Sequence, residues 1–210
     1  MSSPSVTIGG LQWLDYALAG PRRTMAMVTE QKRRYLDPDA RAVAYYAPLL
    51  AGFRRAVSSP DRSTVLDRVV AKAAQGRELS KPVAYRSASD GFLRLLPRGA
   101  TGVPVAQAAW RDGDLSIVLR HMLGLRLRDD TKFLVAPYCK KPELSQEVAD
   151  VLLHLMDALI PEILPGATAV VYDTRHARRY KLGARTNRRS LDALVRSMAS
   201  GYVRHWHLAA

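Results

Sequence analysis

The sequence predicts an α+β protein in which an N-terminal helical portion packs on a small, mainly antiparallel sheet. Three observations predict this class. Hydrophobic residues make up 48% of the 210 residues, which is enough for a packed core. Apolar residues recur at helical spacing in the first hundred residues, and they alternate or run together, as in strands, in several later segments. The expected order is α-α-α-β-β-β-α-β-β-α, with a helical portion in residues 1–97 and an α+β portion in residues 98–210 of one continuous globular unit.

The helical portion is predicted from start and stop signals. Residues 1–36 have weaker signals: a short helix that contains Trp13 could end at Gly20-Pro21, before a basic stretch, and it is not counted in the order above. Asp37 as a cap and Pro38 in the first turn predict a helix that continues to Val57 and is kinked at Pro48. Two further helices are predicted over about residues 60–75 and 80–96.

The character of the chain changes at about residue 103. Residues 103–110 alternate as in a strand, Asp112-Gly113 is typical of a hairpin turn, and residues 115–119 alternate on the returning strand. A loop is expected over residues 122–128, with a turn at Asp129-Asp130. The remaining elements are a central strand at 132–138, a helix capped by Ser145, a strand at 167–172 paired with residues 178–182, and a final helix capped by Asn187.

The net charge of +13 is the strongest global feature of the sequence. Of its 32 basic residues, 25 are arginine, whose guanidinium group binds phosphate through two parallel hydrogen bonds. A coding bias explains the preference for arginine over lysine, but it does not explain the excess of basic over acidic residues. We therefore expect a polyanionic partner, most simply nucleic acid. An acidic protein, a membrane surface and the absence of any polyanion stay open as alternatives.

The same sequence predicts a cytoplasmic protein without membrane insertion. No window approaches the roughly 18 to 20 apolar residues of a spanning helix, and residues 1–10 do not resemble a signal peptide. The single cysteine, Cys139, excludes an internal disulfide. Because there is no Walker loop, GxSxG or GxGxxG motif, we expect no cofactor.

The densest charge cluster begins at the last predicted hairpin. No acidic residue occurs from Thr174 to Leu191, and Tyr180 lies among the cations, where it could stack on a base. Backbone amides at the helix start near Asn187 would add positive potential. The alternative is an ordinary solvated hairpin and helix face, and a second, weaker cluster lies at residues 22–34. The predicted nucleic-acid-binding residues are Arg175, Arg178, Arg179, Tyr180, Lys181, Arg185, Arg188 and Arg189, with His176 among them.

Cys139 is followed by Lys140 and Lys141 at the end of the predicted central strand. Adjacent cations lower a thiol pKa and favour a nucleophile, but a lone cysteine is more often a small core residue. No histidine is an evident base for it. We expect the core role.

The element order from about residue 80 onward resembles the core of the PD-(D/E)XK nucleases, particularly their RecB-like branch. That core runs helix, three antiparallel strands, helix, strand. Asp114 occupies the place of the family's metal-binding aspartate, and Lys140 lies where the family has its lysine. The sequence departs from the family two residues earlier, because Tyr138 and Cys139 precede Lys140 and Lys141 where a carboxylate is needed. Glu143 or Glu78 could take that role.

Three function hypotheses follow. The first is an intracellular, basic, non-catalytic nucleic-acid-binding protein whose binding is dominated by phosphate contacts. The second, implied by the resemblance, is a nuclease that uses Asp114 and Lys140 with Mg²⁺. The third is an adaptor or assembly protein that binds a protein partner through the helical half, with Trp13, Tyr45 and Tyr46 as the aromatic candidates.

Overall fold

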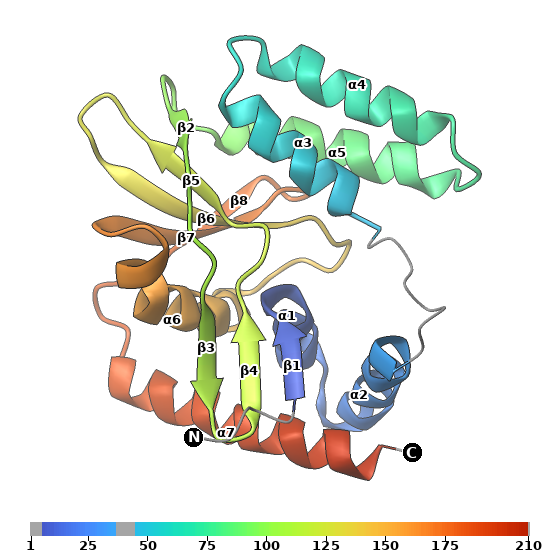
Figure 1. The fold of residues 1–210 in the computed structure, drawn as a ribbon, viewed down its shortest axis with the longest axis vertical. Helices are drawn as coiled ribbons and strands as arrows, with labels where there is room; N and C mark the ends of the chain where they lie inside the picture. Colours follow the sequence, from blue (N-terminus) through green and yellow to red (C-terminus); the bar gives the residue numbers. More distant parts are fainter. Residues whose placement is uncertain (1–5, 37–44, 210) are drawn as a thin grey trace.

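Two mixed sheets form the centre of the protein in the computed structural model, which describes residues 6–36 and 45–209. Strands β6 and β7 pair in parallel, as do β1 and β4, and the other neighbouring pairs are antiparallel. The large sheet has the order β2 (Thr101–Val103), β5 (Leu123–Arg126), β6 (Lys132–Tyr138), β7 (Ala167–Asp173) and β8 (Arg178–Tyr180). The small sheet has the order β1 (Val6–Gly9), β4 (Leu115–Val118) and β3 (Ala109–Asp112) (Figure 1).

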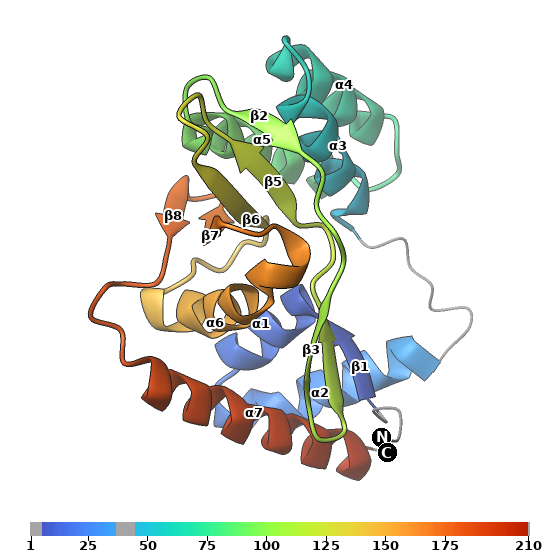
Figure 2. The same ribbon diagram turned by 60° about the vertical axis from the view of Figure 1, so that its left-hand side comes forward.

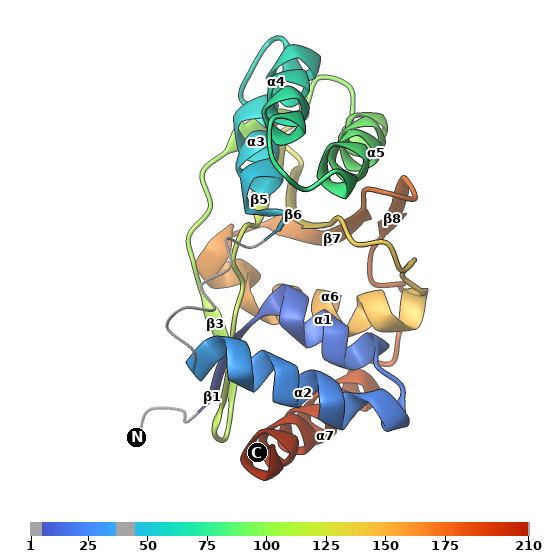
Figure 3. The ribbon, with the colours of Figure 1, turned by 90° about the vertical axis from the view of Figure 1, so that its right-hand side faces the viewer.

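Seven helices in the described residues cover these sheets in layers. Helices α3, α4 and α5 cover one face of the large sheet, and α6 and α1 lie on the opposite side, with α7 and α2 beyond them (Figure 3). Their bounds are α1 Gly10–Leu18, α2 Pro21–Leu36, α3 Ala47–Val57, α4 Arg62–Ala74, α5 Ser80–Leu95, α6 Gln146–Ile163 and α7 Arg188–Leu208.

Strand β6 separates two hydrophobic cores because successive side chains of a strand point to opposite faces. Leu134 and Tyr138 belong to the core that β6 shares with α1, α6 and α7, whereas Val135 and Cys139 belong to the core beneath α3–α5. A strand buried on both faces needs apolar residues at nearly every position, as residues 133–139 show. The division of the chain at residues 97 and 98 stays a prediction.

The segment that connects the large sheet to the small sheet differs from the predicted strands. Residues 103–110 are not one strand, because β2 ends at Val103 in the large sheet and β3 starts at Ala109 in the small one (Figure 2). Pro104 lies at the break, and proline has no amide hydrogen to continue the ladder. The expected loop at residues 122–128 contains β5, which pairs with both β2 and β6. The fold is therefore mixed α/β with two sheets, and the prediction of a single sheet was wrong.

Several predictions for the helices need correction. Tyr45 and Tyr46 lie in a turn, so Pro48 begins α3 in its first turn and does not kink a longer helix. The predicted start at Asp37-Pro38 lies outside the described residues. The basic stretch that follows Gly20, for which no element was expected, is helix α2. Helix α6 continues through Pro161 to Ile163, because a proline in the last turn of a helix removes only one hydrogen bond.

Other predictions are confirmed. The Ser145 hydroxyl accepts a hydrogen bond from the Val148 amide, and the side-chain Oδ1 atom of Asn187 accepts one from the Ser190 amide, so both residues cap their helices. Strand β6 has the predicted bounds, and the hairpin turns at Gly113, whose φ of 52° lies in the left-handed region. Within residues 6–36 and 45–209, no helix is both long enough and apolar enough to cross a membrane.

Candidate nucleic-acid interface

The loop between β7 and β8 is held in place by the carboxylate of Asp173, which is completely buried. Its oxygens accept hydrogen bonds from the amides of Leu144 (3.2 Å) and His176 (3.3 Å). The His176 Nδ1 atom lies 2.9 Å from both carboxylate oxygens. Because Nδ1 is engaged in this contact, Nε2 is the ring nitrogen that remains for a ligand. Asp173 therefore fixes both the loop and the orientation of the His176 ring.

Helix α5 also determines where this loop lies. Gly91 of α5 contacts the backbone of Thr174 so closely that a methyl group at Gly91 would overlap the Thr174 carbonyl oxygen. On the other side, Thr174 donates through its amide and its hydroxyl to the Tyr138 carbonyl oxygen, each at 2.9 Å. The loop that carries the cations is thus attached to both α5 and β6.

Three of the predicted cations have partners elsewhere in the chain. Arg178 forms an ion pair with Glu143, and Arg188 forms one with Asp157 at 2.7 Å. Arg175 lies beside Tyr46, where its charge partly offsets the rise that burial causes in the pKa of the Tyr46 hydroxyl. The cluster without local carboxylates is therefore partly neutralised by carboxylates distant in sequence.

Four cations remain exposed on β8, the following loop and the start of α7. They make no ion pair with any described residue. β8 is an edge strand of the large sheet, so one side of its backbone is also unpaired. We call Arg179, Lys181, Arg185 and Arg189 the β8–α7 surface.

Tyr180 does not take the stacking role that its position in the sequence suggested. Only 8% of the residue is exposed, and its hydroxyl donates to the Leu144 carbonyl oxygen. Side chains alternate along β8, so Tyr180 faces the core while Arg179 faces the opposite side of the strand. Burial raises the pKa of the Tyr180 hydroxyl. Its ring anchors β8 and is not accessible to a base.

The start of α7 lies directly after the loop. Asn187 uses its side chain to cap the amide of Ser190. The amides of Arg188 and Arg189 occupy the first two helical positions, where an α-helix provides no internal acceptor. Their partial positive charge adds to that of the β8–α7 surface.

The residues carried over from the nuclease resemblance do not meet. Asp114 is exposed in the turn between β3 and β4, and this turn lies at the end of the hairpin distant from the large sheet (Figure 2). The Asp114 carbonyl oxygen accepts a hydrogen bond from the Val6 amide. The Lys140 ammonium lies 2.6 and 2.5 Å from the carboxylate oxygens of Asp15 on α1. In the part of the chain that the structure describes, no group of three or more His, Cys, Asp or Glu side chains is placed to hold a metal ion.

Cys139 is a core residue. Only 2% of it is exposed, and burial raises the pKa of its thiol to about 12. We therefore expect a thiol-specific disulfide reagent at pH 8 to leave the native protein unmodified and to react with one thiol per chain in denaturant. Rapid modification of the native protein would contradict the buried position of Cys139.

The remaining sequence candidates are placed as follows. On α2, Glu30 forms ion pairs with Arg33 and Arg34, which reduces the charge of the second basic cluster. Trp13 is completely buried, so it contributes nothing to a binding surface. Tyr45 and Tyr46 are partly buried, and their rings form a T-shaped contact with 4.7 Å between the ring centroids.

The part of the site that sequence reasoning missed is the pair formed by Asp173 and His176. The sequence places His176 within the cationic cluster without indicating a role for it, and it does not single out Asp173. Their spacing of three residues at the end of a β-strand was visible in the sequence. Burial of the carboxylate, which makes the pair rigid, was not visible.

Replacement of Asp173 by alanine should destabilise the protein. The buried amide of Leu144 would lose its acceptor, and an unsatisfied buried amide costs about 1–3 kcal/mol. We expect a loss of about 2 kcal/mol in the free energy of unfolding, measured by urea denaturation. Asp67→Ala is the matched control, since that exposed carboxylate forms an ion pair with the solvent-exposed Arg86 and its loss should change stability by less than about 1 kcal/mol. Equal effects of the two substitutions would contradict the anchoring role of Asp173.

No protein-family model, no curated protein and no solved structure matches the chain.

Proposed function

We propose that the protein binds nucleic acid through the β8–α7 surface, without catalysis and mainly through phosphate contacts. The observation that carries this proposal is the set of four exposed cations, Arg179, Lys181, Arg185 and Arg189, for which the described residues provide no carboxylate. Exposed arginines without partners supply donors in the geometry that phosphate accepts. The loop anchored by Asp173 carries His176, and the amides in the first turn of α7, which have no acceptor within the helix, extend the positive region.

The net charge supports the same proposal. A formal charge of +13 attracts any polyanion, so affinity alone does not identify a surface. The proposal therefore predicts that positive charge on the β8–α7 surface contributes more to binding than positive charge elsewhere. Removing the four cations of the β8–α7 surface should weaken binding much more than removing four cations elsewhere.

The test compares two variants that both lower the formal net charge from +13 to +9. The site variant carries Arg179→Ala, Lys181→Ala, Arg185→Ala and Arg189→Ala. The control variant carries Arg55→Ala, Arg68→Ala, Lys72→Ala and Arg77→Ala, four exposed positions on α3, α4 and the turn that follows α4. Arg178 and Arg188 are left in place because they have carboxylate partners.

Fluorescence anisotropy with labelled DNA and RNA oligonucleotides provides the measurement. Loss of three to four phosphate contacts should weaken binding by at least about tenfold in the site variant, and the control should change much less. Equal weakening in both variants would contradict the proposed surface. Absence of binding by the unmodified protein would contradict the function itself.

Cations on an edge strand also prevent two sheets from pairing edge to edge. If this were their only role, the site variant would self-associate and keep its affinity for nucleic acid. Sedimentation velocity on the same samples separates the two roles.

The nuclease and adaptor hypotheses remain as alternatives. Asp114 and Lys140 lie in different parts of the fold, and Trp13 is buried. Mg²⁺- or Mn²⁺-dependent cleavage that disappears in Asp114→Ala would restore the nuclease hypothesis.

A further inference from the structure

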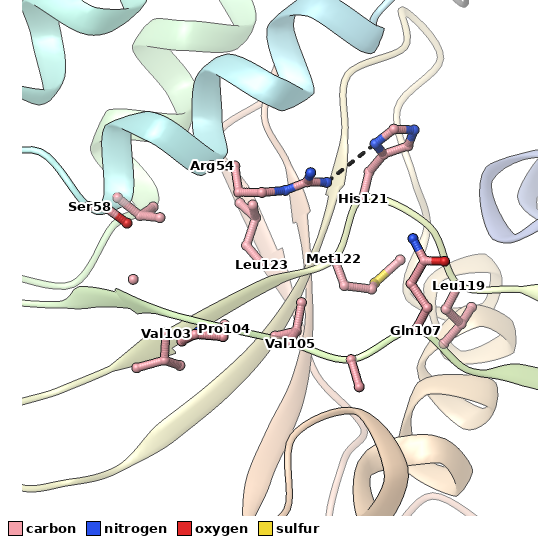
Figure 4. Close-up of a pocket in the computed structure, with 14 residues that line it drawn as sticks. Arg54, Ser58, Val103, Pro104, Val105, Gln107, Leu119, His121, Met122 and Leu123 are labelled. Carbon is pink, nitrogen blue, oxygen red and sulfur yellow. Dashed lines mark hydrogen bonds between the residues drawn. The ribbon is translucent and has the colours of Figure 1, made fainter.

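A cavity of about 360 Å³ lies where the chain passes from one sheet to the other next to α3 (Figure 4). Three segments form its walls: the end of α3, the connection from β2 to β3, and the connection from β4 to β5. Most of the lining is apolar, from Val57, Val103, Val105, Leu119, Met122 and Leu123. Ligand sites in proteins are mostly apolar cavities of about this size with a few polar groups.

Two glycines allow the chain segments that line the cavity to approach each other closely on one side of it. Gly124 of β5 pairs with Val103 of β2, and a side chain at Gly124 would lie 2.6 Å from the Val103 carbonyl oxygen. A side chain at Gly102 would lie 2.7 Å from the Ser58 hydroxyl oxygen. After this close approach, Pro104 ends the pairing and the chain continues to the small sheet. The cavity occupies the resulting bend.

The polar end of the cavity is formed by Arg54 and His121, which point toward each other in Figure 4. The Arg54 guanidinium donates to the Nδ1 atom of His121 at 3.4 Å, which requires a neutral imidazole. Burial lowers the pKa of His121, and the charges of Arg54 and Arg120 lower it further, so the ring is neutral at neutral pH. His121 has a φ of 61°, a backbone conformation that is uncommon for a non-glycine residue.

The charge of the cavity has one sign. Among the described residues, Arg54 and His121 are the ionisable side chains that line it, and none of the lining residues in this part of the chain is a carboxylate. In the described chain Arg54 forms no ion pair, so four of its five N–H groups remain for a ligand. A planar guanidinium beside an apolar cavity matches a carboxylate on an apolar body.

We propose that this cavity binds a small organic carboxylate whose apolar body contains about eight carbon atoms, with the carboxylate on Arg54. An apolar cavity of about 150 Å³ accommodates benzene, so a cavity of about 360 Å³ has room for an eight-carbon body together with the carboxylate. His121 is a positioning residue, because it orients the guanidinium. This proposal does not depend on nucleic-acid binding, since the β8–α7 surface contributes no residue to the cavity.

The test uses three probes with the same chain length and different head groups: octanoate, octanol and octylammonium. Amide chemical shifts in ¹H–¹⁵N spectra of the full chain report where each probe binds. Octanoate should cause saturable shifts at Gly102, His121 and Gly124, octanol weaker ones, and octylammonium none at these positions. Equal binding of octylammonium, or octanoate shifts confined to other parts of the molecule, would overturn the proposal.

Two matched substitutions separate the local charge from the general charge of the protein. Arg54→Met keeps the length of the side chain and removes its charge, while Arg55→Met does the same at the next position, which does not line the cavity. Octanoate affinity should fall at least about tenfold in Arg54→Met, the effect of losing a charged hydrogen bond, and stay unchanged in Arg55→Met. Val105→Phe, which fills the cavity, should abolish binding of octanoate and octanol. Unchanged affinity in Arg54→Met or in Val105→Phe would contradict the site.

Discussion

Replacing Gly91 by alanine should destabilise the protein by at least about 2 kcal/mol, although alanine is the better helix former. In the interior of a helix this exchange normally stabilises by about 1 kcal/mol. At Gly91 the added methyl group would overlap the Thr174 carbonyl oxygen and lie 2.9 Å from its carbonyl carbon. Such overpacking costs about 1–3 kcal/mol or more, because both contacts are backbone atoms that cannot rotate away. The steric effect therefore exceeds the gain in helix propensity.

Urea denaturation measures this loss, and Gly20→Ala is its matched control. A methyl group at Gly20 would meet no atom within 4 Å, so the free energy of unfolding should change by less than about 0.5 kcal/mol or rise slightly. In Gly91→Ala the largest amide shifts should lie in residues 173–178, because the β7–β8 loop must move away from α5. Stability equal to that of the unmodified protein would contradict the close contact between Gly91 of α5 and the Thr174 backbone.

Local signals in the sequence predicted much of the fold. Ser145 and Asn187 revealed two helix starts because capping depends only on the neighbouring three residues. The central strand had the correct bounds because an uninterrupted apolar run of seven residues has few alternatives. The hairpin at Gly113 followed from turn chemistry.

Elements that depend on distant partners were missed. Strand β1 has four residues and is a strand because it pairs with β4, more than one hundred residues later in the chain. Strand β5 has the sequence Leu-Gly-Leu-Arg, and its glycine concealed the alternation of apolar and polar residues that indicates a strand. Helix α2 has little apolar character, but Pro21 at its first position was a usable start signal.

The candidate site shows the same limit. The sequence located the cationic segment from Arg175 to Arg189, but it did not show which cations have partners. Glu143 and Asp157 form ion pairs with Arg178 and Arg188 although they lie 35 and 31 residues earlier in the chain. The absence of carboxylates near these arginines in the sequence therefore overstated the number of unpaired positive charges. The burial of Tyr180 follows from which face of β8 meets the core, a question of register that residue types alone do not answer.

The salt dependence of binding should distinguish the β8–α7 surface from all other cations. Each cation that neutralises a phosphate releases condensed counterions, so the logarithm of the binding constant falls with the logarithm of salt by about 0.9 per contact on duplex DNA. Removing four contacts should therefore flatten the slope by about 3 to 4. Between 50 and 200 mM salt, the unmodified protein should lose roughly a hundredfold more affinity than the site variant. Removal of exposed side chains on β8 and α7 should leave thermal stability nearly unchanged.

The most direct test of the central claim is this slope, measured for the unmodified protein, the site variant and the control variant on one duplex. The β8–α7 surface predicts a slope that is flatter by about 3 to 4 for the site variant and nearly unchanged for the control variant. Equal slopes for the two variants would contradict the assignment of nucleic-acid binding to Arg179, Lys181, Arg185 and Arg189.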